Sequence, residues 1–323
     1  MMRYAPKRET VVALGGVVLS TMLSCSGSKP PPPGPAGKGA AAGSAEGAGD
    51  AGEDAAADTA YETLVSGGLR RHYRLHLPAD DRAGRPLPVV LAFHGRGESA
   101  RKIQSYAGLD GLPAIVGYPQ GEPSKDEADK RSWQGAPYAA GADDVQFVRD
   151  LLEHLQRTRA VDPKRVYATG KSNGGGFAAL LACRMADRIA AVAPVAGAYY
   201  PPSPPCQPSR PVPVLELHGT EDPVIAYEGN AKKGVPPIGT WLRGWAERDG
   251  CTRGPTVFMS QADITAERWS GCAGGSAVEH YRIAGGGHTW PGATVSSGPG
   301  ATTHTIDAAK VLWSFFIEHP LPP

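Results

Sequence analysis

A serine at position 172 stands among glycines in the run ATGKSNGGGF, residues 168–177. Glycines lie two residues before and two residues after it, a G-x-S-x-G pattern typical of a serine nucleophile on a sharp strand-to-helix turn. Because 42 glycines make a chance match easy, the setting must support the motif. RVYATG before it reads as a buried strand and GFAALLACRMA after it as a helix. We therefore predict that Ser172 lies on a turn so tight that Gly170 and Gly174 have no room for side chains.

A serine hydroxyl needs a base to remove its proton, and that base needs an acid to orient it. The acid is offered by VPVLELHGTEDP, residues 212–223, where a predicted strand ends and Asp222 follows. Glu221 is the alternative acid. We prefer Asp222 because Pro223 directly after it would fix its direction.

The candidate base is His288, on the glycine-rich loop of YRIAGGGHTWPG after another predicted strand. His304, just before the last predicted helix, is the serious competitor among nine histidines. His94 and His218 each close a strand before a glycine and are interpreted as structural. The chain order Ser172, Asp222, His288 fits the α/β-hydrolase arrangement.

Two backbone amides are needed to bind the negative oxygen that forms when a serine attacks a carbonyl carbon. Asn173, directly after the serine and at a helix start, is predicted to supply one. The other is assigned to the amide of Arg96 in FHGRGES, which follows a strand over 89–93 and resembles an HGGG-type loop. The alternative for this segment is an ordinary glycine turn.

These residues must be positioned by alternating strands and helices. Apolar runs predict strands at residues 89–93, 114–118, 165–169, 189–195, 212–217 and 277–283. Apolar side chains at helical spacing predict helices around residues 145–155 and 308–315. We therefore expect an α/β fold, with a mostly parallel central sheet, helices on both faces and chemistry on the loops.

The segments FHGRGES, GYPQG, RSWQG, ADDVQFV, VDPKRVYATGKSNGG, DRIAAVAPVAG, RPVPVLELHGTEDP and GGGHTWPG follow one another in a family order. In this the chain resembles the secreted polyhydroxybutyrate depolymerase-like esterases, which include feruloyl and acetylxylan esterases. The resemblance extends from Tyr61 nearly to the C-terminus. It implies an α/β-hydrolase with a Ser172, Asp222 and His288 triad and no metal or organic cofactor.

The predicted reaction is ester hydrolysis, with activity lost as pH falls through about 6.5, the ordinary histidine pKa. Feruloyl or acetyl esters of plant polysaccharides are the preferred substrates. The alternatives are polyhydroxyalkanoate depolymerisation, peptide hydrolysis, and a non-catalytic glycan-binding lipoprotein on a hydrolase fold. The complete triad favours an enzyme.

Trp133 and Trp290 are predicted to form an aromatic rim for a phenolic or sugar ring. The alternative is that each packs within its own loop. Trp241 and Trp245, four residues apart, are assigned to a packed helix face.

Two cationic residues depart from the family pattern. Lys171 stands where the family usually has an apolar residue, and Arg96 where it has a small or neutral one. Their side chains either favour substrates that carry a carboxylate or point into solvent.

Four cysteines besides Cys25 form an even set without zinc-site spacing, which in an exported chain favours disulfides. We prefer Cys183 with Cys206 and Cys251 with Cys272, because each pair closes a short loop and the two pairs flank Asp222. They are expected to hold the acid and base loops in register. The alternative is a free, buried Cys183.

The N-terminus is predicted to be an export signal, residues 1–25, with a charged start and an apolar run too short for a permanent membrane span. It ends in MLSC, which resembles a lipobox with Cys25 as the lipid-modified residue; ordinary secretion is the alternative. Residues 26–60 contain no aromatic or branched aliphatic side chain and are predicted to be a disordered tether. The esterase domain is expected at 61–323.

Charge and composition narrow the partners. The formal net charge is +1, and no run of five or more basic residues occurs, so nothing favours nucleic acid. We expect a monomer that binds an ester substrate, contacts a membrane only through a lipid on Cys25, and is either a lipoprotein in the periplasm or on the cell surface or a secreted protein.

Overall fold

The computed structural model describes residues 60–79 and 84–322. The predicted signal peptide, Cys25 and all of the predicted tether except Ala60 lie outside the described residues. Within the described ranges, no helix has both the length and the apolar character needed to cross a membrane.

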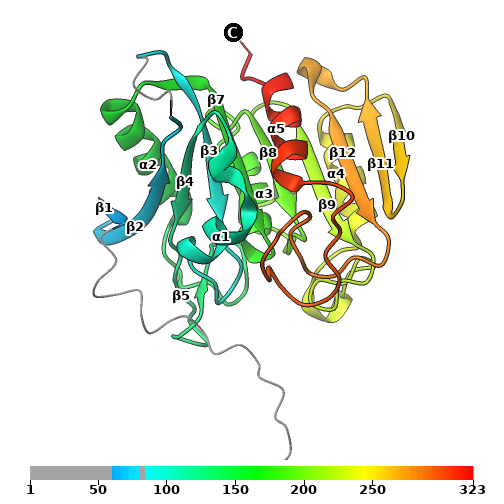
Figure 1. The fold of residues 1–323 in the computed structure, drawn as a ribbon, viewed down its shortest axis with the longest axis horizontal. Helices are drawn as coiled ribbons and strands as arrows, with labels where there is room; N and C mark the ends of the chain where they lie inside the picture. Colours follow the sequence, from blue (N-terminus) through cyan, green and yellow to red (C-terminus); the bar gives the residue numbers. More distant parts are fainter. Residues whose placement is uncertain (1–59, 80–83, 323) are drawn as a thin grey trace, which may run out of the picture. The chain divides into compact units, whose positions relative to one another are not determined.

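Six parallel strands form the centre of a ten-stranded sheet (Figure 1). In spatial order they are β4 (Ile115–Pro119), β3 (Leu87–Phe93), β7 (Val161–Lys171), β8 (Ala191–Val195), β9 (Val214–Gly219) and β12 (Val278–Ile283). These are the six strands that the apolar runs predicted, and the mostly parallel sheet is confirmed. The runs are recognisable because strands covered on both faces are apolar along their whole length.

Four further strands extend the sheet in antiparallel fashion and were not predicted. They are β2 (Leu69–His76) and β1 (Tyr61–Ser66) beside β4, and β11 (Ile264–Ser270) and β10 (Arg253–Gln261) beside β12. Most residues of β10 are exposed. Such edge strands carry many polar residues, so hydrophobicity alone does not reveal them. Two short strands, β5 (Glu122–Pro123) and β6 (Arg131–Ser132), pair separately.

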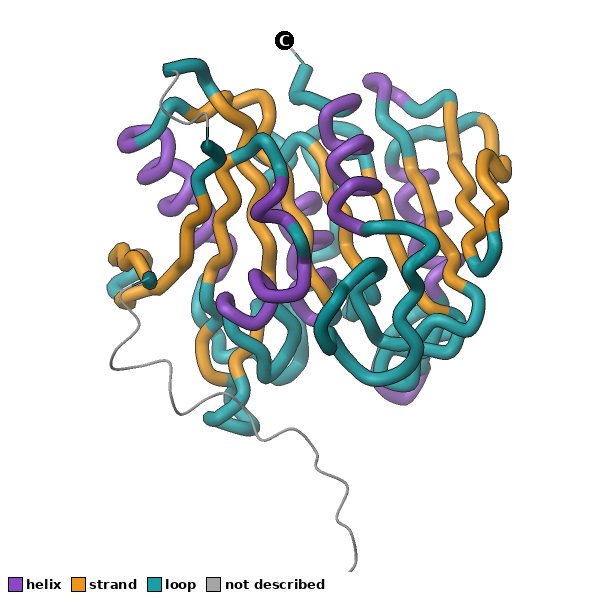
Figure 2. The backbone as a smooth tube through the Cα atoms, in the orientation of Figure 1, coloured by secondary structure: helices purple, strands orange, loops and turns teal. Residues whose placement is uncertain are grey.

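Helices cover both faces of the sheet, as predicted (Figure 2). The α-helices of the described ranges are α1 (Ala100–Ala107), α2 (Asp144–Thr158), α3 (Asn173–Arg184), α4 (Ile238–Arg248) and α5 (Ala308–Glu318). Short 3-10 turns occupy Leu109–Gly111, Ala231–Lys233 and Ala273–Gly275. Buried side chains of α2, α3 and α4 pack in one core, and those of α1 and α5 pack in the other.

Successive side chains of a central strand belong alternately to one core and to the other. Val89 and Leu91 of β3 belong to the core beneath α2, α3 and α4, whereas Val90 and Ala92 belong to the core beneath α1 and α5. This follows from the strand geometry, in which successive side chains point to opposite faces.

Because the six central strands are parallel, their carboxyl ends lie along the same edge of the sheet. The candidate residues follow β3, β7, β9 and β12 at this edge.

Two disulfides join elements outside the acid and base loops. Cys183 bonds to Cys206 and Cys251 bonds to Cys272, which is the preferred pairing. The first ties α3 to the loop after β8, and the second ties the segment after α4 to the turn between β11 and β12. The expectation that they hold the Asp222 and His288 loops in register is therefore wrong. Bridges across loops of 23 and 21 residues typically contribute about 3 kcal/mol each.

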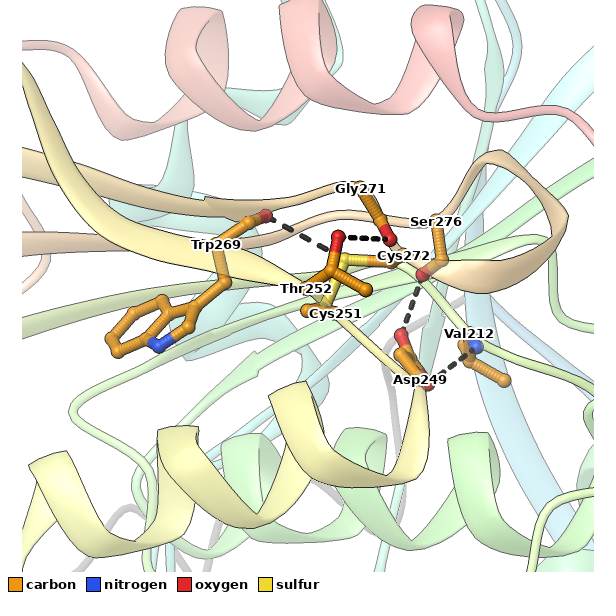
Figure 3. Close-up of a disulfide and its surroundings, with 8 residues drawn as sticks. All are labelled: Val212, Asp249, Cys251, Thr252, Trp269, Gly271, Cys272 and Ser276. Carbon is orange, nitrogen blue, oxygen red and sulfur yellow. Dashed lines mark hydrogen bonds between the residues drawn. A yellow bond between two sulfur atoms is a disulfide. The ribbon is translucent and has the colours of Figure 1, made fainter.

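A buried carboxyl group lies beside the second disulfide (Figure 3). Asp249 is fully buried, accepts a hydrogen bond of 2.5 Å from the Ser276 hydroxyl, and accepts another of 3.2 Å from the Val212 amide. Burial raises the pKa of Asp249 to about 6. The carboxyl group thus joins the end of α4 to the start of β9 and to the turn that holds Cys272.

Candidate active site

Ser172 lies between β7 and α3 with a backbone that few non-glycine residues adopt. Its φ is 57° and its ψ is −121°, a strained conformation of the kind stored at functional sites. A Cβ on Gly170 would lie 2.6 Å from the Phe93 carbonyl oxygen, and one on Gly174 would lie 2.0 Å from the same atom. The predicted need for glycine at both positions is confirmed, and the close partner includes the end of β3 as well as the helix.

Asp222 and His288 meet although 66 residues separate them. His288 Nδ1 lies 2.7 Å from Asp222 Oδ2, and both residues are buried. A carboxylate can only accept, so Nδ1 carries the proton and Nε2 is left as an acceptor. The other carboxylate oxygen, Oδ1, accepts the amides of Val224 and Ile225 at 2.8 Å each. The carboxylate is thus held from both sides.

The alternatives for acid and base lie elsewhere. Glu221 is exposed, whereas Asp222 beside it is buried. His304, the competing base, is also exposed. The backbone amide of Glu221 donates to the Gly286 carbonyl at 3.0 Å, so the acid loop and the base loop are joined by the main chain.

Lys171, directly before the serine, connects the turn to the base loop. Its ammonium group donates to Glu98 Oε1 at 2.9 Å and to the carbonyl of Ser297. Ser297 lies in the loop between β12 and α5 that carries His288, drawn in orange to red along the lower edge of the sheet in Figure 1. Glu98 Oε2 also accepts the Gly95 amide at 3.0 Å. One partly buried ion pair therefore joins the segments around Ser172, His288 and Gly95.

Neither cationic side chain is free to recognise a carboxylate. Lys171 is 2% exposed, which contradicts the solvent-facing alternative, and Glu98 compensates its charge. Arg96 pairs with Asp126 at 2.8 Å and Glu127 at 2.7 Å. The hypothesis of a preference for carboxylate-bearing substrates loses its basis, because both charges are already neutralised.

The candidate oxyanion donors lie on two segments that meet at Ser172. A Cβ on Gly95 would come within 3.5 Å of the Ser172 Cβ, which places the FHGRGES loop against the serine. Among the described residues, the backbone amides of Arg96 and Asn173 have no acceptor. Two amides without partners beside the serine are what an oxyanion site requires.

His94 holds the FHGRGES loop in place. Its Nδ1 donates to the Gly95 carbonyl at 2.8 Å, and its Nε2 accepts the Gly121 amide at 3.0 Å. Burial lowers the pKa of His94 to about 4, so the ring stays neutral and both bonds persist at neutral pH. The structural interpretation of this histidine agrees with the contacts.

The predicted aromatic rim is wrong. Trp133 is fully buried, stacks on Phe177 and donates from its indole nitrogen to the His94 carbonyl at 3.0 Å. Trp290 is 1% exposed and packs against Tyr106. Closeness to a motif in the sequence does not set the direction of a side chain, and both rings turn inward into core.

A cavity of about 370 Å³ lies beside the turn instead. One wall is a face of α3 that begins at Asn173, the residue after the serine, and runs to Cys183. Ser172 and His288 themselves do not line it. The other walls include four aromatic residues, namely Tyr199, Tyr200, Trp241 and Trp245. Tyr199 and Trp241 stack with ring centroids 3.7 Å apart. Assigning Trp241 and Trp245 only to a packed helix face missed this role.

The first disulfide also belongs to this cavity. Both Cys183 and Cys206 line it, so the bond fixes the proline-rich loop over residues 200–206 to the α3 wall. The Tyr200 ring in this loop meets the Tyr138 ring edge to face at 6.1 Å. The loop that forms this wall of the cavity is therefore fixed by a disulfide and by an aromatic contact.

Burial lowers the pKa of His288 below its ordinary value, and nearby Lys171 adds to the effect, although the Asp222 hydrogen bond opposes it. A lower pKa keeps the ring neutral to a lower pH. If His288 is the base, the acid limb of kcat/KM lies below pH 6.5, the ordinary value expected from the sequence. Rates with p-nitrophenyl acetate from pH 4 to 8 measure it. A limb centred above pH 6.5 would contradict this assignment.

Similarity to known proteins agrees with this geometry. A family model described as Esterase PHB depolymerase matches residues 71–204. A putative esterase, NocK, of Nocardia uniformis subsp. tsuyamanensis is 31% identical over 346 residues, which cover 95% of this chain and 98% of that protein. Feruloyl esterase B of Piromyces equi is 34% identical over 218 residues, 62% of this chain and 39% of that longer protein.

A solved structure shares the fold. The acetyl xylan esterase from Aspergillus awamori aligns with a TM-score of 0.56 at 13% identity, over 80% of this chain and 99% of its own. The chain therefore belongs to the Esterase PHB depolymerase family and has the α/β-hydrolase fold. It is a carboxylic ester hydrolase.

Proposed function

We propose that the protein hydrolyses carboxylic esters through an acyl-enzyme on Ser172, with His288 as base and Asp222 as the acid that orients it. The observation that carries the proposal is the buried 2.7 Å hydrogen bond between His288 Nδ1 and Asp222 Oδ2. This hydrogen bond leaves Nε2 of His288 free to accept a proton. In the same fold, a strained turn between β7 and α3 presents Ser172.

In the proposed reaction, His288 Nε2 takes the hydroxyl proton as Ser172 Oγ bonds to the ester carbonyl carbon. The amides of Arg96 and Asn173 stabilise the negative oxygen. The carbon–oxygen bond to the alcohol then breaks, and His288 returns the proton to the leaving alcohol. Water, deprotonated by the same nitrogen, then attacks the acyl carbon. The bond between this carbon and Ser172 Oγ breaks, His288 returns the proton to Oγ, and the carboxylic acid is released.

The proposed substrates are esters of aromatic acids, of the feruloyl type, attached to plant polysaccharides. The cavity supports this choice over acetyl esters, because its four aromatic side chains and its volume suit a ring rather than a methyl group. The related feruloyl esterase B supports it as well. The family description also makes hydroxyalkanoate polyesters a second candidate.

A substrate panel tests this proposal. Methyl ferulate is expected to give a higher kcat/KM than p-nitrophenyl acetate, p-nitrophenyl butyrate or hydroxybutyrate oligomers. Trp241→Ala should lower kcat/KM for methyl ferulate by about fivefold, because aromatic contacts are worth about 1 kcal/mol beyond area burial, with a smaller loss for the acetate ester. Trp313→Ala is the matched control, since Trp313 packs in α5 with the other core.

The outcomes distinguish the candidates. A higher kcat/KM for hydroxybutyrate oligomers than for methyl ferulate would favour hydroxyalkanoate polyesters as the substrates. Equal losses for ferulate and acetate esters in Trp241→Ala would remove the cavity from acyl recognition.

We further propose that residues 61–323 form the esterase domain and that the protein is exported. Two disulfides support export, because they persist in oxidising compartments. Anchoring through a lipid on Cys25 is part of the proposal and is tested by mass spectrometry of the mature N-terminus. An unmodified mature protein that starts elsewhere would indicate ordinary secretion.

A further inference from the structure

A second buried histidine lies behind the Asp222 carboxylate. His218 is the residue before the last one of β9, and its Nε2 is 3.4 Å from Asp222 Oδ2, the oxygen that also faces His288. The side chains of His218 and Asp222 are fully buried. The contact is therefore shielded from water, so a positive charge on His218 would act on Asp222 with little screening.

Both ring nitrogens of His218 face acceptors. Nδ1 is 2.8 Å from Glu216 Oε1, and Nε2 is 2.9 Å from the Ile225 carbonyl oxygen in addition to its contact with Asp222. A carbonyl oxygen cannot donate, so Nε2 carries a proton. The proton on Nδ1 depends on whether Glu216 is ionised.

Glu216 is surrounded by donors. Besides His218, its Oε1 accepts the Tyr199 hydroxyl at 3.2 Å. Its Oε2 lies 2.8 Å from His280 Nδ1, an ion-pair distance, but accepts no hydrogen bond among the described residues. The Tyr227 hydroxyl can donate a hydrogen bond to His280 Nε2 at 2.8 Å. With Nε2 as the acceptor, the ring proton of His280 is on Nδ1, which faces Glu216. A fully buried carboxyl group among several donors is stable as a carboxylate, so Nδ1 of His218 carries a proton as well.

We propose that His218 is a positioning residue for the reaction, a permanently charged imidazolium held by Glu216 that fixes the Asp222 carboxylate behind His288 and keeps it ionised. The inference rests on the proposed triad. Burial alone would lower the pKa of His218, but Glu216 and Asp222 raise it to about 10, in agreement with the donor geometry. Burial would likewise raise the pKa of Asp222, and the hydrogen bonds from His218 and His288 lower it.

The charge of His218 also limits the basicity of His288. An imidazolium on the far side of Asp222 offsets part of the negative charge that would otherwise stabilise protonated His288. Among the described residues, the other charged groups nearby are Lys171 and its partner Glu98, on the side of the base loop, and Glu216, which lies behind His218. With His218 charged, the Asp222–His218–Glu216 group carries one net negative charge, which a proton on His288 neutralises.

The pH dependence of His218→Gln tests the proposal. Loss of the cation should move the acid limb of kcat/KM upward by roughly one pH unit, and a less firmly held Asp222 should lower kcat/KM at the plateau by about tenfold to hundredfold. Tyr227→Phe is the matched control, because it removes a hydroxyl from the same buried group and leaves both charges in place; its limb should coincide with that of the wild type. A lower plateau with an unmoved limb would mean that His218 only supports packing.

A second measurement needs no variant. In the wild-type protein labelled with nitrogen-15 at histidine, one imidazole should keep both ring protons at pH 8, and in Glu216→Gln this doubly protonated ring should be lost. If all rings are singly protonated at pH 8, the pair is neutral and the proposal is overturned. That result is independent of esterase activity, so it is distinguishable from a failure of the proposed triad, which would show as full activity in Ser172→Ala.

Discussion

Ser172→Ala is expected to lower kcat/KM for ester substrates by about five to six powers of ten, because the proposed acyl-enzyme forms on the Ser172 hydroxyl. The fold should be unaffected, since alanine keeps the Cβ and can take the same strained backbone at similar cost. Hydrolysis of p-nitrophenyl acetate and thermal melting measure the two effects. An organophosphate probe should label the wild-type protein at Ser172 and leave the variant unlabelled.

Ser105→Ala is a suitable control, because Ser105 is exposed on α1 and its hydroxyl donates to the Lys102 carbonyl of the same helix. It should retain wild-type activity and labelling. Residual activity above about one part in a thousand in Ser172→Ala would point to a different nucleophile and overturn the proposed mechanism.

Asp222→Asn should lower kcat by about four powers of ten, through the proton position on His288. Two backbone amides, those of Val224 and Ile225, bind Oδ1 and would select the oxygen of the asparagine. Its NH2 group must then face His288 Nδ1 in place of Oδ2. Nδ1 becomes an acceptor, the ring proton moves to Nε2, and the base can no longer take the serine proton.

Glu221→Gln is the matched control for this change, because Glu221 is the neighbouring carboxylate, the alternative acid, and is exposed. Its activity should match the wild type at every pH from 5 to 8. If Glu221→Gln instead loses activity while Asp222→Asn keeps it, the acid has been assigned to the wrong residue.

The contacts among Lys171, Glu98 and Ser297 show that the role of a charged residue near a motif depends on its partners in the fold. From the sequence, the lysine before Ser172 has two interpretations, a group that recognises a substrate carboxylate or a side chain that points into solvent. The structure uses it to join three loops instead, since a buried ammonium group is stable only when paired. The role of such a residue follows from its partners, which come from segments more than 70 residues away.

The sequence positions of the tryptophans likewise do not predict what their side chains contact. The spacing of Trp241 and Trp245 correctly indicates one face of a helix, but not what that face meets. It meets the loop after β8 and the wall of α3, and together they enclose the cavity. Trp133 and Trp290, although next to motif residues, turn into the two cores.

The sequence by itself determined the six parallel strands, the turn at Ser172, the candidate acid and base, and the preferred cysteine pairs. These follow from local causes, namely continuous apolar runs in strands buried on both faces, glycines where backbones touch, and the order of loops along the chain. The tertiary structure alone decided the antiparallel edges, the walls of the cavity and the buried contacts of His218. Those depend on which strands and helices become neighbours, as β9 and β12 bring Glu216 beside His280, and no local pattern records such contacts between distant segments.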